Sequence, residues 1–234
     1  MSKIGINEIR IVAEKLCELD KRFVLIGGCS PQFIVDVRYK ETVRPTMDID
    51  FVIESESRID YSNIEQKLRD LGFKHDMRPN KPKCKWHYDK IEVDILPSSP
   101  KAAEFGSRWF EMALDMAFSQ QLDNGLSINV INPACFLAAK LDAFFDRGKN
   151  DYYGSADLED IIMLLESCSA LLEDIQSAPK ELRTYVANGI NRLLGSHNFI
   201  EALPGHLSPE SPPRTGDRVL DIAGQIVDMD KIQQ

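Results

Sequence analysis

The sequence is short of several features that would place it in a special class of protein. It has five cysteines, an odd number, and no two of them form a C-x-x-C pair. Neither a disulfide framework nor a cysteine zinc site is therefore predicted, and we expect reduced thiols. The 234 residues contain no uninterrupted apolar run of the length that a signal peptide or membrane span needs. We therefore expect a cytoplasmic location and no membrane partner.

Positive charge is also scarce. Lysine and arginine number 28 against 37 acidic residues, which gives a formal net charge of −9. Such a surface repels polyanions as a whole, so any contact with nucleic acid is expected to be a local patch. Only 13 residues are Gly and 12 are Pro, while 43% are hydrophobic, a balance typical of folded domains. The length suffices for one large domain or two small ones.

The hydrophobic pattern divides the chain into two parts. Three segments have the composition of strands: 23–26, 48–53 and 91–96. A hairpin is also expected, with its turn at residues 123–125. Helices are expected at 4–19, 31–37, 60–71, 132–147, 157–175 and 181–194. We predict an α/β (α+β) fold with a small mixed sheet over residues 1–131, followed by a helical region over residues 132–234.

Carboxylates recur on two of the predicted strands. Asp48 and Asp50 alternate with apolar residues, so they share one face of a strand, and Glu92 and Asp94 repeat the pattern. If Asp94 joins the first pair, three like charges repel unless a cation neutralises them, and oxygen ligands favour Mg²⁺ or Mn²⁺. Two such ions can assist phosphoryl transfer. The alternative interpretation is the polar face of half-exposed strands.

A glycine pair follows the first predicted strand. Gly27 and Gly28 lead into Ser30, a predicted helix N-cap, and Pro31, in the first helical turn. Backbone N–H groups at such a helix start bind anions, and the Ser30 hydroxyl could donate to a phosphate. The alternative is that the glycines only permit a tight turn.

One lysine of the helical part lies on an apolar helix face. The neighbours of Lys140 at three and four positions are Phe136, Leu137, Ala143 and Phe144. A lysine there must either extend its ammonium to the surface or meet an anion, since an unpaired buried charge is costly. Phosphate is a natural partner.

Basic residues gather between the second and third predicted strands. Lys81, Lys83 and Lys85 alternate, so on a strand they would share a face beside the strand that bears Asp94. An RNA acceptor end could lie along that face. The alternative is an edge strand that lysines protect against aggregation.

The order of these motifs resembles the nucleotidyltransferases with the DNA polymerase β-like fold, whose signature is a glycine turn, a spacer helix and D-x-D on the next strand. More narrowly, residues 22–165 resemble the AbiEii/AbiGii toxin-like branch, which contains toxins of toxin–antitoxin systems. The segments that carry this resemblance are IGGCSPQF, VRPTMDIDFVI, VDIL and NPACFLAAKLDAFFDRGKNDYYGSADLEDII. The spacer from Gly28 to Asp48 is longer than the minimal signature has, so the acceptor side of the turn could differ.

The resemblance implies roles for individual residues. It assigns metal binding to Asp48, Asp50 and Asp94, with Asp94 also helping to activate the attacking hydroxyl. It assigns nucleotide binding to Gly27, Gly28, Ser30, Lys140 and Asp151. The catalytic set implied is Asp48, Asp50, Asp94 and Lys140.

The function expected from this resemblance is transfer of a nucleoside monophosphate from an NTP to an acceptor hydroxyl, with Mg²⁺ or Mn²⁺ as cofactor and release of pyrophosphate. The acceptor could be an RNA end, a protein or a small molecule, and an antitoxin protein is an expected partner. The alternative is a degenerate module that binds a nucleotide or a protein without turnover. The sequence leaves open the choice of NTP, the oligomeric state, and whether Glu92 or Asp151 contributes.

Overall fold

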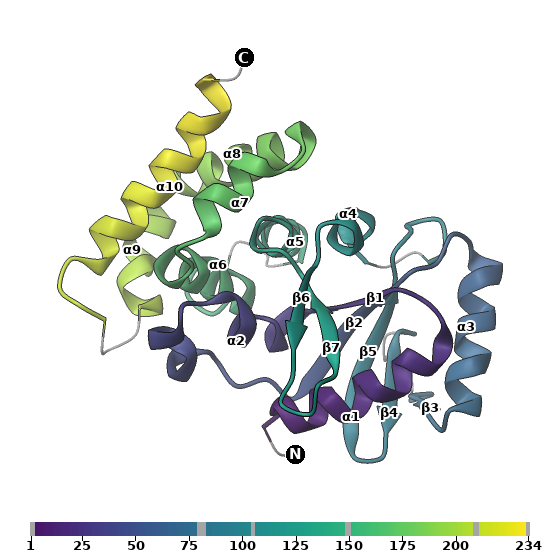
Figure 1. Ribbon diagram of the computed structural model, residues 1–234. Coiled ribbons are helices and arrows are strands. Elements are labelled where there is room, and N and C mark those ends of the chain that lie inside the picture. Colours follow the sequence, from purple (N-terminus) through teal and green to yellow (C-terminus); the bar gives the residue numbers. More distant parts are fainter. Residues whose placement is uncertain (1–2, 79–82, 104–105, 148–150, 208–210, 233–234) are drawn as a thin grey trace. The chain divides into compact units, whose positions relative to one another are not determined.

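The computed structural model describes residues 3–78, 83–103, 106–147, 151–207 and 211–232 (Figure 1). The chain forms two compact units. Unit 1 comprises Met1–Phe33 and Arg44–Ile131, and unit 2 comprises Ile34–Val43 and Asn132–Gln234. The sequence analysis assigned residues 34–43 to the first domain, whereas they pack with the second unit.

Within the described residues, unit 1 is built on a seven-stranded mixed sheet with the order β3-β4-β5-β2-β1-β7-β6. The strands are β1 (Phe23–Ile26), β2 (Asp48–Ile53), β3 (Lys74–His75), β4 (Lys85–Tyr88), β5 (Ile91–Pro97), β6 (Phe118–Gln121) and β7 (Ser127–Val130). Strand β2 runs parallel to β5 and antiparallel to β1, and β1 runs parallel to β7. The predicted mixed α/β fold is confirmed, and β6 and β7 form the hairpin predicted around residues 123–125. The short strands β3 and β4 were not predicted as separate strands.

The helices of unit 1 are α1 (Ile6–Leu16), α2 (Pro31–Ile34), α3 (Arg58–Asp70) and α4 (Phe110–Asp115), with 3₁₀ turns η1 (Cys17–Leu19) and η2 (Gly27–Cys29). Helix α3 begins where the Ser57 side chain accepts a hydrogen bond from Asp60 N. It ends before Gly72, which has φ +93°. The Tyr61 hydroxyl donates to Ile95 O at 2.6 Å, which ties α3 to β5. The helix therefore helps to hold the strand that carries Asp94.

Helix α2 ends earlier than predicted. The sequence analysis expected a helix over 31–37, but only Pro31–Ile34 is α-helical, and a 3₁₀ helix, η3 (Val37–Thr42), follows. Asp36 has an extended backbone (φ −58°, ψ 148°), and its N–H donates to Ser167 O at 2.9 Å in unit 2. A contact distant in sequence thus overrides the local helical pattern.

Unit 2 is helical in its described part. Its helices are α5 (Pro133–Arg147), α6 (Ala156–Ser167), α7 (Leu171–Ser177), α8 (Lys180–Leu194), α9 (His197–His206) and α10 (Thr215–Ile232). The single helix predicted over 157–175 was wrong, because the backbone becomes extended at Cys168 (φ −107°, ψ 100°) between α6 and α7. Arg218 Nη2 donates to Tyr39 Oη at 2.9 Å and to Glu166 O at 2.8 Å, which attaches η3 to this unit. No helix in the described ranges combines the length and apolar character required to cross a membrane.

Candidate active site

The strand register gathers four carboxylates on one face of unit 1. The parallel pairing of β2 with β5 sets Asp48 beside Glu92 and Asp50 beside Asp94. Because side chains alternate along a strand, all four project to the same side of the sheet. Ile49, which lies between Asp48 and Asp50, is buried on the opposite side. The two strands thus bring together the three aspartates that the sequence analysis selected, and they add Glu92.

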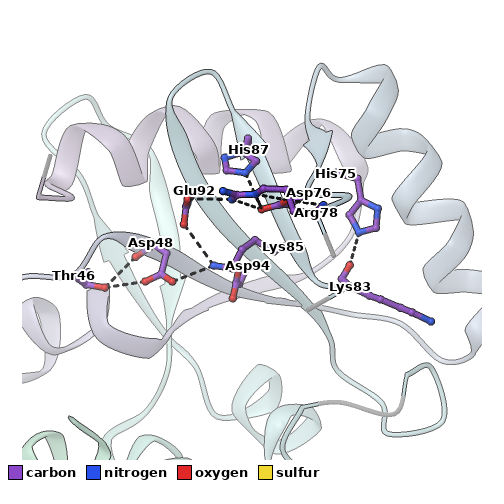
Figure 2. A network of polar contacts seen from close by, with 10 residues as sticks. All are labelled: Thr46, Asp48, His75, Asp76, Arg78, Lys83, Lys85, His87, Glu92 and Asp94. Carbon is purple, nitrogen blue, oxygen red and sulfur yellow. Dashed lines mark hydrogen bonds and ion pairs between the residues drawn. The ribbon is translucent and has the colours of Figure 1, made fainter. Parts of the chain in front are cut away.

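A lysine lies among these carboxylates. Lys85 of β4 is directly opposite Asp94 in the antiparallel β4–β5 register. Figure 2 shows contacts from its ammonium to Asp48 and Glu92. Lys85 Nζ lies 3.0 Å from Asp94 Oδ1, 3.4 Å from Asp48 Oδ2 and 3.7 Å from Glu92 Oε2. Only 10% of the Lys85 side chain is exposed. One positive charge is therefore shared by three acidic side chains.

The predicted shared face of three lysines beside the strand of Asp94 is borne out for Lys85 alone, since β4 pairs with β5. Lys81 lies outside the described residues, and Lys83 is exposed but sits in a turn before β4 begins. Lys85, the first residue of β4, is buried. The attraction of Asp94 directly across the register turns its ammonium toward the carboxylates instead of toward solvent.

The ion pairs shift the pKa values of their members. Burial lowers the pKa of Lys85, but the hydrogen bond and charge of Asp94, together with the other two carboxylates, outweigh it, so the net shift is upward. Burial raises the pKa of Asp94 above its ordinary value, and Lys85 offsets only part of that rise. Lys85 is therefore charged at neutral pH, and Asp94 is a better proton acceptor than an ordinary aspartate.

The glycine bend lies directly against the D-x-D pair. Gly27 has φ +65°, and a Cβ added to it would overlap with Asp50 Oδ2. A Cβ added to Gly28 would lie 3.1 Å from Oγ1 of Thr46. The Thr46 hydroxyl in turn donates to Asp48 Oδ1 at 3.1 Å. The absence of a side chain at Gly27 lets the bend approach Asp50, and Gly28 approaches Thr46, which is bonded to Asp48.

Ser30 has an internal partner. It is fully buried, and its hydroxyl donates to Gly27 O at 2.8 Å. It does not act as the predicted side-chain N-cap, and with only four residues α2 contributes little of the helix dipole invoked for anion binding. In the described structure Ser30 therefore stabilises the bend, and its contact with a phosphate stays a prediction from the family resemblance.

Further charged and polar side chains form ion pairs and hydrogen bonds beside Glu92. Asp76, whose side chain is 2% exposed, accepts hydrogen bonds from Arg78 Nε at 2.9 and 3.0 Å, and His87 Nε2 lies 3.3 Å from its Oδ2. Arg78 Nη2 lies 3.8 Å from Glu92 Oε1. The Arg78 guanidinium holds the pKa of Asp76 well below its usual range. A continuous network, drawn in Figure 2, thus links Asp48 to His87 through alternating charges.

Lys140 also meets carboxylates of its own chain. Lys140, on α5, places its Nζ 3.1 Å from Asp157 Oδ1 and 2.6 Å from Asp160 Oδ2, both on α6. Burial lowers the pKa of Lys140, but the two aspartates outweigh it and the net shift is upward. Of the two outcomes that the sequence analysis allowed for this lysine, the anionic partner is therefore present within unit 2. Contact with a nucleotide phosphate stays a prediction.

Asp151 is exposed and closes a turn. Its Oδ1 accepts hydrogen bonds from Tyr153 N at 3.2 Å and from Gly154 N at 2.8 Å. Aspartate side chains commonly stabilise turns in this way. The described contacts of Asp151 are local, and its part in nucleotide binding stays a prediction.

The donor set on unit 1 suits a hard divalent cation. Carboxylate oxygens are the ligands that Mg²⁺ and Mn²⁺ prefer, and here they already surround one positive charge. In the described part of the chain, no three Asp, Glu, His or Cys side chains stand ready to hold a metal ion as they lie. The chemistry of the residues fits a metal, while the Lys85 ammonium lies within 3.7 Å of three of these carboxylates.

A mixed sheet that carries a D-x-D pair beside a glycine bend, followed by a helical region, is the arrangement expected from the resemblance to the polymerase β-like nucleotidyltransferases. The structure is similar to JHP933 from Helicobacter pylori, with 12% identity, a TM-score of 0.50, and coverage of 97% of this chain and 94% of that chain. It also matches the antibiotic-resistance factor ANT(2'')-Ia, with 12% identity, a TM-score of 0.46, and coverage of 82% and 95%.

The sequence identifies the family more narrowly. Residues 10–211 match the AbiEii nucleotidyl transferase toxins of type IV toxin–antitoxin systems. Because this match spans most of the chain, the chain belongs to that family and is a nucleotidyltransferase. No curated protein matches the sequence.

Proposed function

We propose that this chain transfers a nucleoside monophosphate from an NTP to an acceptor hydroxyl at the carboxylate face of unit 1, in a reaction that requires Mg²⁺ or Mn²⁺. One observation carries the proposal: β2 and β5 bring Asp48, Asp50 and Asp94 together beside the Gly27 bend. Family membership supports the reaction class, and the oxygen donors support the choice of metal.

In this proposal Asp48, Asp50 and Asp94 hold the metal. A bound divalent ion would supply positive charge to the triphosphate and stabilise the ionised acceptor oxygen. A carboxylate oxygen of Asp94 accepts the proton of the acceptor hydroxyl. That oxygen bonds to the α-phosphorus, the bond from this phosphorus to the bridging oxygen breaks, and pyrophosphate leaves.

The backbone at Gly27 and Gly28 is the proposed contact for the triphosphate, since it adjoins the D-x-D pair and has no side chains in the way. The roles of Ser30, Lys140 and Asp151 in nucleotide binding rest on the family resemblance. Lys140 has to share its charge with Asp157 and Asp160 if it contacts a phosphate.

Asp48→Asn and Asp50→Asn test the reaction. Each variant keeps the size of the side chain but removes a metal-binding charge, so we expect transfer to fall about a hundredfold or more. The assay incubates each of four α-labelled NTPs with cell lysate, separates labelled RNA, protein and small molecules, and measures pyrophosphate. The matched control is Asp123→Asn at an exposed turn. Unchanged transfer in either test variant would contradict the proposal, and nucleotide binding without pyrophosphate release would favour a binding module instead.

We further propose that the chain acts as a toxin with a cognate antitoxin, as the family description implies. Induced expression should arrest growth, and Asp50→Asn should abolish the arrest because it removes transfer. Co-expression of the adjacent gene should restore growth. Growth arrest by the Asp50→Asn variant would separate toxicity from nucleotidyl transfer.

A further inference from the structure

The position of Lys85 is not explained by packing of the sheet alone. The residue before the core position Trp86 is expected to face the solvent side of an antiparallel pair, and lysines on outer strands commonly extend into water. Lys85 instead keeps 10% of its side chain exposed and places Nζ among three carboxylates. Electrostatic attraction to these carboxylates therefore holds the ammonium in place.

The charge balance shows what the ammonium does. Asp48, Glu92 and Asp94 contribute three negative charges within 3.7 Å of Lys85 Nζ. Carboxylates this close repel one another, and a cation between them removes most of that repulsion. A second basic group, Arg78, lies near Glu92 and forms its closest ion pair with Asp76. For the two metal-binding aspartates of this group, Lys85 is thus the neutralising cation in the described structure.

The same oxygens cannot serve two cations at full strength. Oδ1 of Asp94 and Oδ2 of Asp48 are the atoms nearest to Lys85, and both aspartates are metal ligands in the proposed function. A divalent ion at these oxygens would meet the repulsion of an ammonium within a few ångströms. Metal binding therefore requires the Lys85 side chain to give up at least part of its contacts.

We propose that Lys85 is a built-in counter-ion of the active site, which holds Asp48 and Asp94 together without metal and competes with the divalent cation for their oxygens. The inference rests on the proposed function, since it assumes that these aspartates bind the metal. Lys85 is then a positioning residue. It keeps the metal-binding carboxylates close together before a metal ion binds, and it weakens their affinity for that ion.

Lys85→Met provides the test, because methionine keeps an unbranched side chain and removes the charge. Mn²⁺ binding is measured by calorimetry and by electron paramagnetic resonance on the full chain. We expect Lys85→Met to bind Mn²⁺ about tenfold more tightly than the unaltered chain, since a neighbouring positive charge is gone. Without metal it should unfold at lower temperature, and added Mn²⁺ should raise its melting temperature by more than that of the unaltered chain.

Two further variants serve as references. Lys83→Met removes an exposed lysine from the turn just before β4 and should leave Mn²⁺ affinity unchanged. Lys85→Arg keeps the charge and should bind Mn²⁺ no more tightly than the unaltered chain. If Lys85→Met does not fold without metal, Lys85→Gln replaces it in the same measurements.

The outcomes separate the two proposals. If the unaltered chain binds Mn²⁺ and Asp94→Asn does not, the metal site stands. Unchanged or weaker binding by Lys85→Met would then overturn the counter-ion alone. If neither the unaltered chain nor Lys85→Met binds Mn²⁺, the metal site of the proposed function fails, and the counter-ion inference fails with it.

Discussion

Replacing Lys140 with methionine tests whether the ion pairs of unit 2 stabilise the fold. Lys140 is the shared partner of Asp157 and Asp160, and the side chains of Lys140 and Asp160 are only 14% and 4% exposed. Its removal leaves two carboxylates close together with their shared cation gone. They must then repel each other in a region of low dielectric or take up a proton.

The expected loss of stability is large. Removing one partner of a buried ion pair costs about 3–5 kcal/mol. For a chain of this size, such a loss lowers the melting temperature by about 6–20 °C. A second change, Asp160→Asn, should recover part of the loss in the double variant, because it removes one of the two charges that Lys140 no longer neutralises.

The assay can distinguish the two units. Both tryptophans, Trp86 and Trp109, belong to unit 1, so their fluorescence follows that unit, whereas far-ultraviolet circular dichroism is dominated by helices and reports strongly on unit 2. Lys140→Met should lower the dichroism midpoint. The matched control is Lys180→Met, at an exposed position of α8. If Lys140→Met melts like this control, the ion pairs contribute no net stability and the reasoning is refuted.

Two further predictions concern unit 1. Arg78 lowers the pKa of Asp76, so the ionised Asp76 stabilises the fold above the ordinary aspartate pKa of about 4, and this stability is lost as pH falls toward the lowered value. Urea unfolding between about pH 5 and pH 2 should therefore depend less on pH for Asp76→Asn than for the unaltered chain, and equal slopes would contradict this. Gly27→Ala should lose Mn²⁺ binding, because the new Cβ would overlap with Asp50 Oδ2. Gly205→Ala, where an added Cβ meets no atom within 4 Å, is the control, and equal affinity in both variants would count against the close approach.

The strands with strong alternation could be predicted from the sequence. Asp48–Ile53 alternates acidic and apolar residues at its start and ends in buried apolar residues, and β2 has these bounds. The same pattern in Ile91–Pro97 gives β5. The period of two in a strand predicts which side chains share a face. To predict that the aspartates gather on one side, only the pairing of β2 with β5 had to be added.

The role of Lys85 was missed because its hairpin has an unusual turn. Tyr88 pairs with Ile91 across the two-residue loop at Asp89 and Lys90, and counting back from this pair sets Lys85 opposite Asp94. Two-residue hairpin loops usually contain glycine, whereas Asp89 here adopts φ +51° without one. The register was therefore present in the sequence, but its usual turn signal was not.

The behaviour of Ser30 and helix α2 could not be predicted from local pattern. A serine before a proline is a typical helix start, yet the Ser30 hydroxyl donates backward to Gly27 O. The helix stops because Asp36 bonds to Ser167, more than a hundred residues away in the sequence. Contacts of this kind depend on the packed unit, so no rule on neighbouring residues would have found them.

Lys85 and Lys140, which both lie largely out of water, obey the same rule, and together they show what the rule can and cannot predict. A buried ammonium requires an anion, but the requirement is met equally well by a substrate phosphate or by the chain's own aspartates. Lys85 and Lys140 each have such internal partners. A metal or a nucleotide that engages these residues therefore exchanges one ion pair for another, and the measured affinity reports the difference between the two. For this reason the decisive variants are those that remove the internal competitor, and not only those that remove the expected ligand.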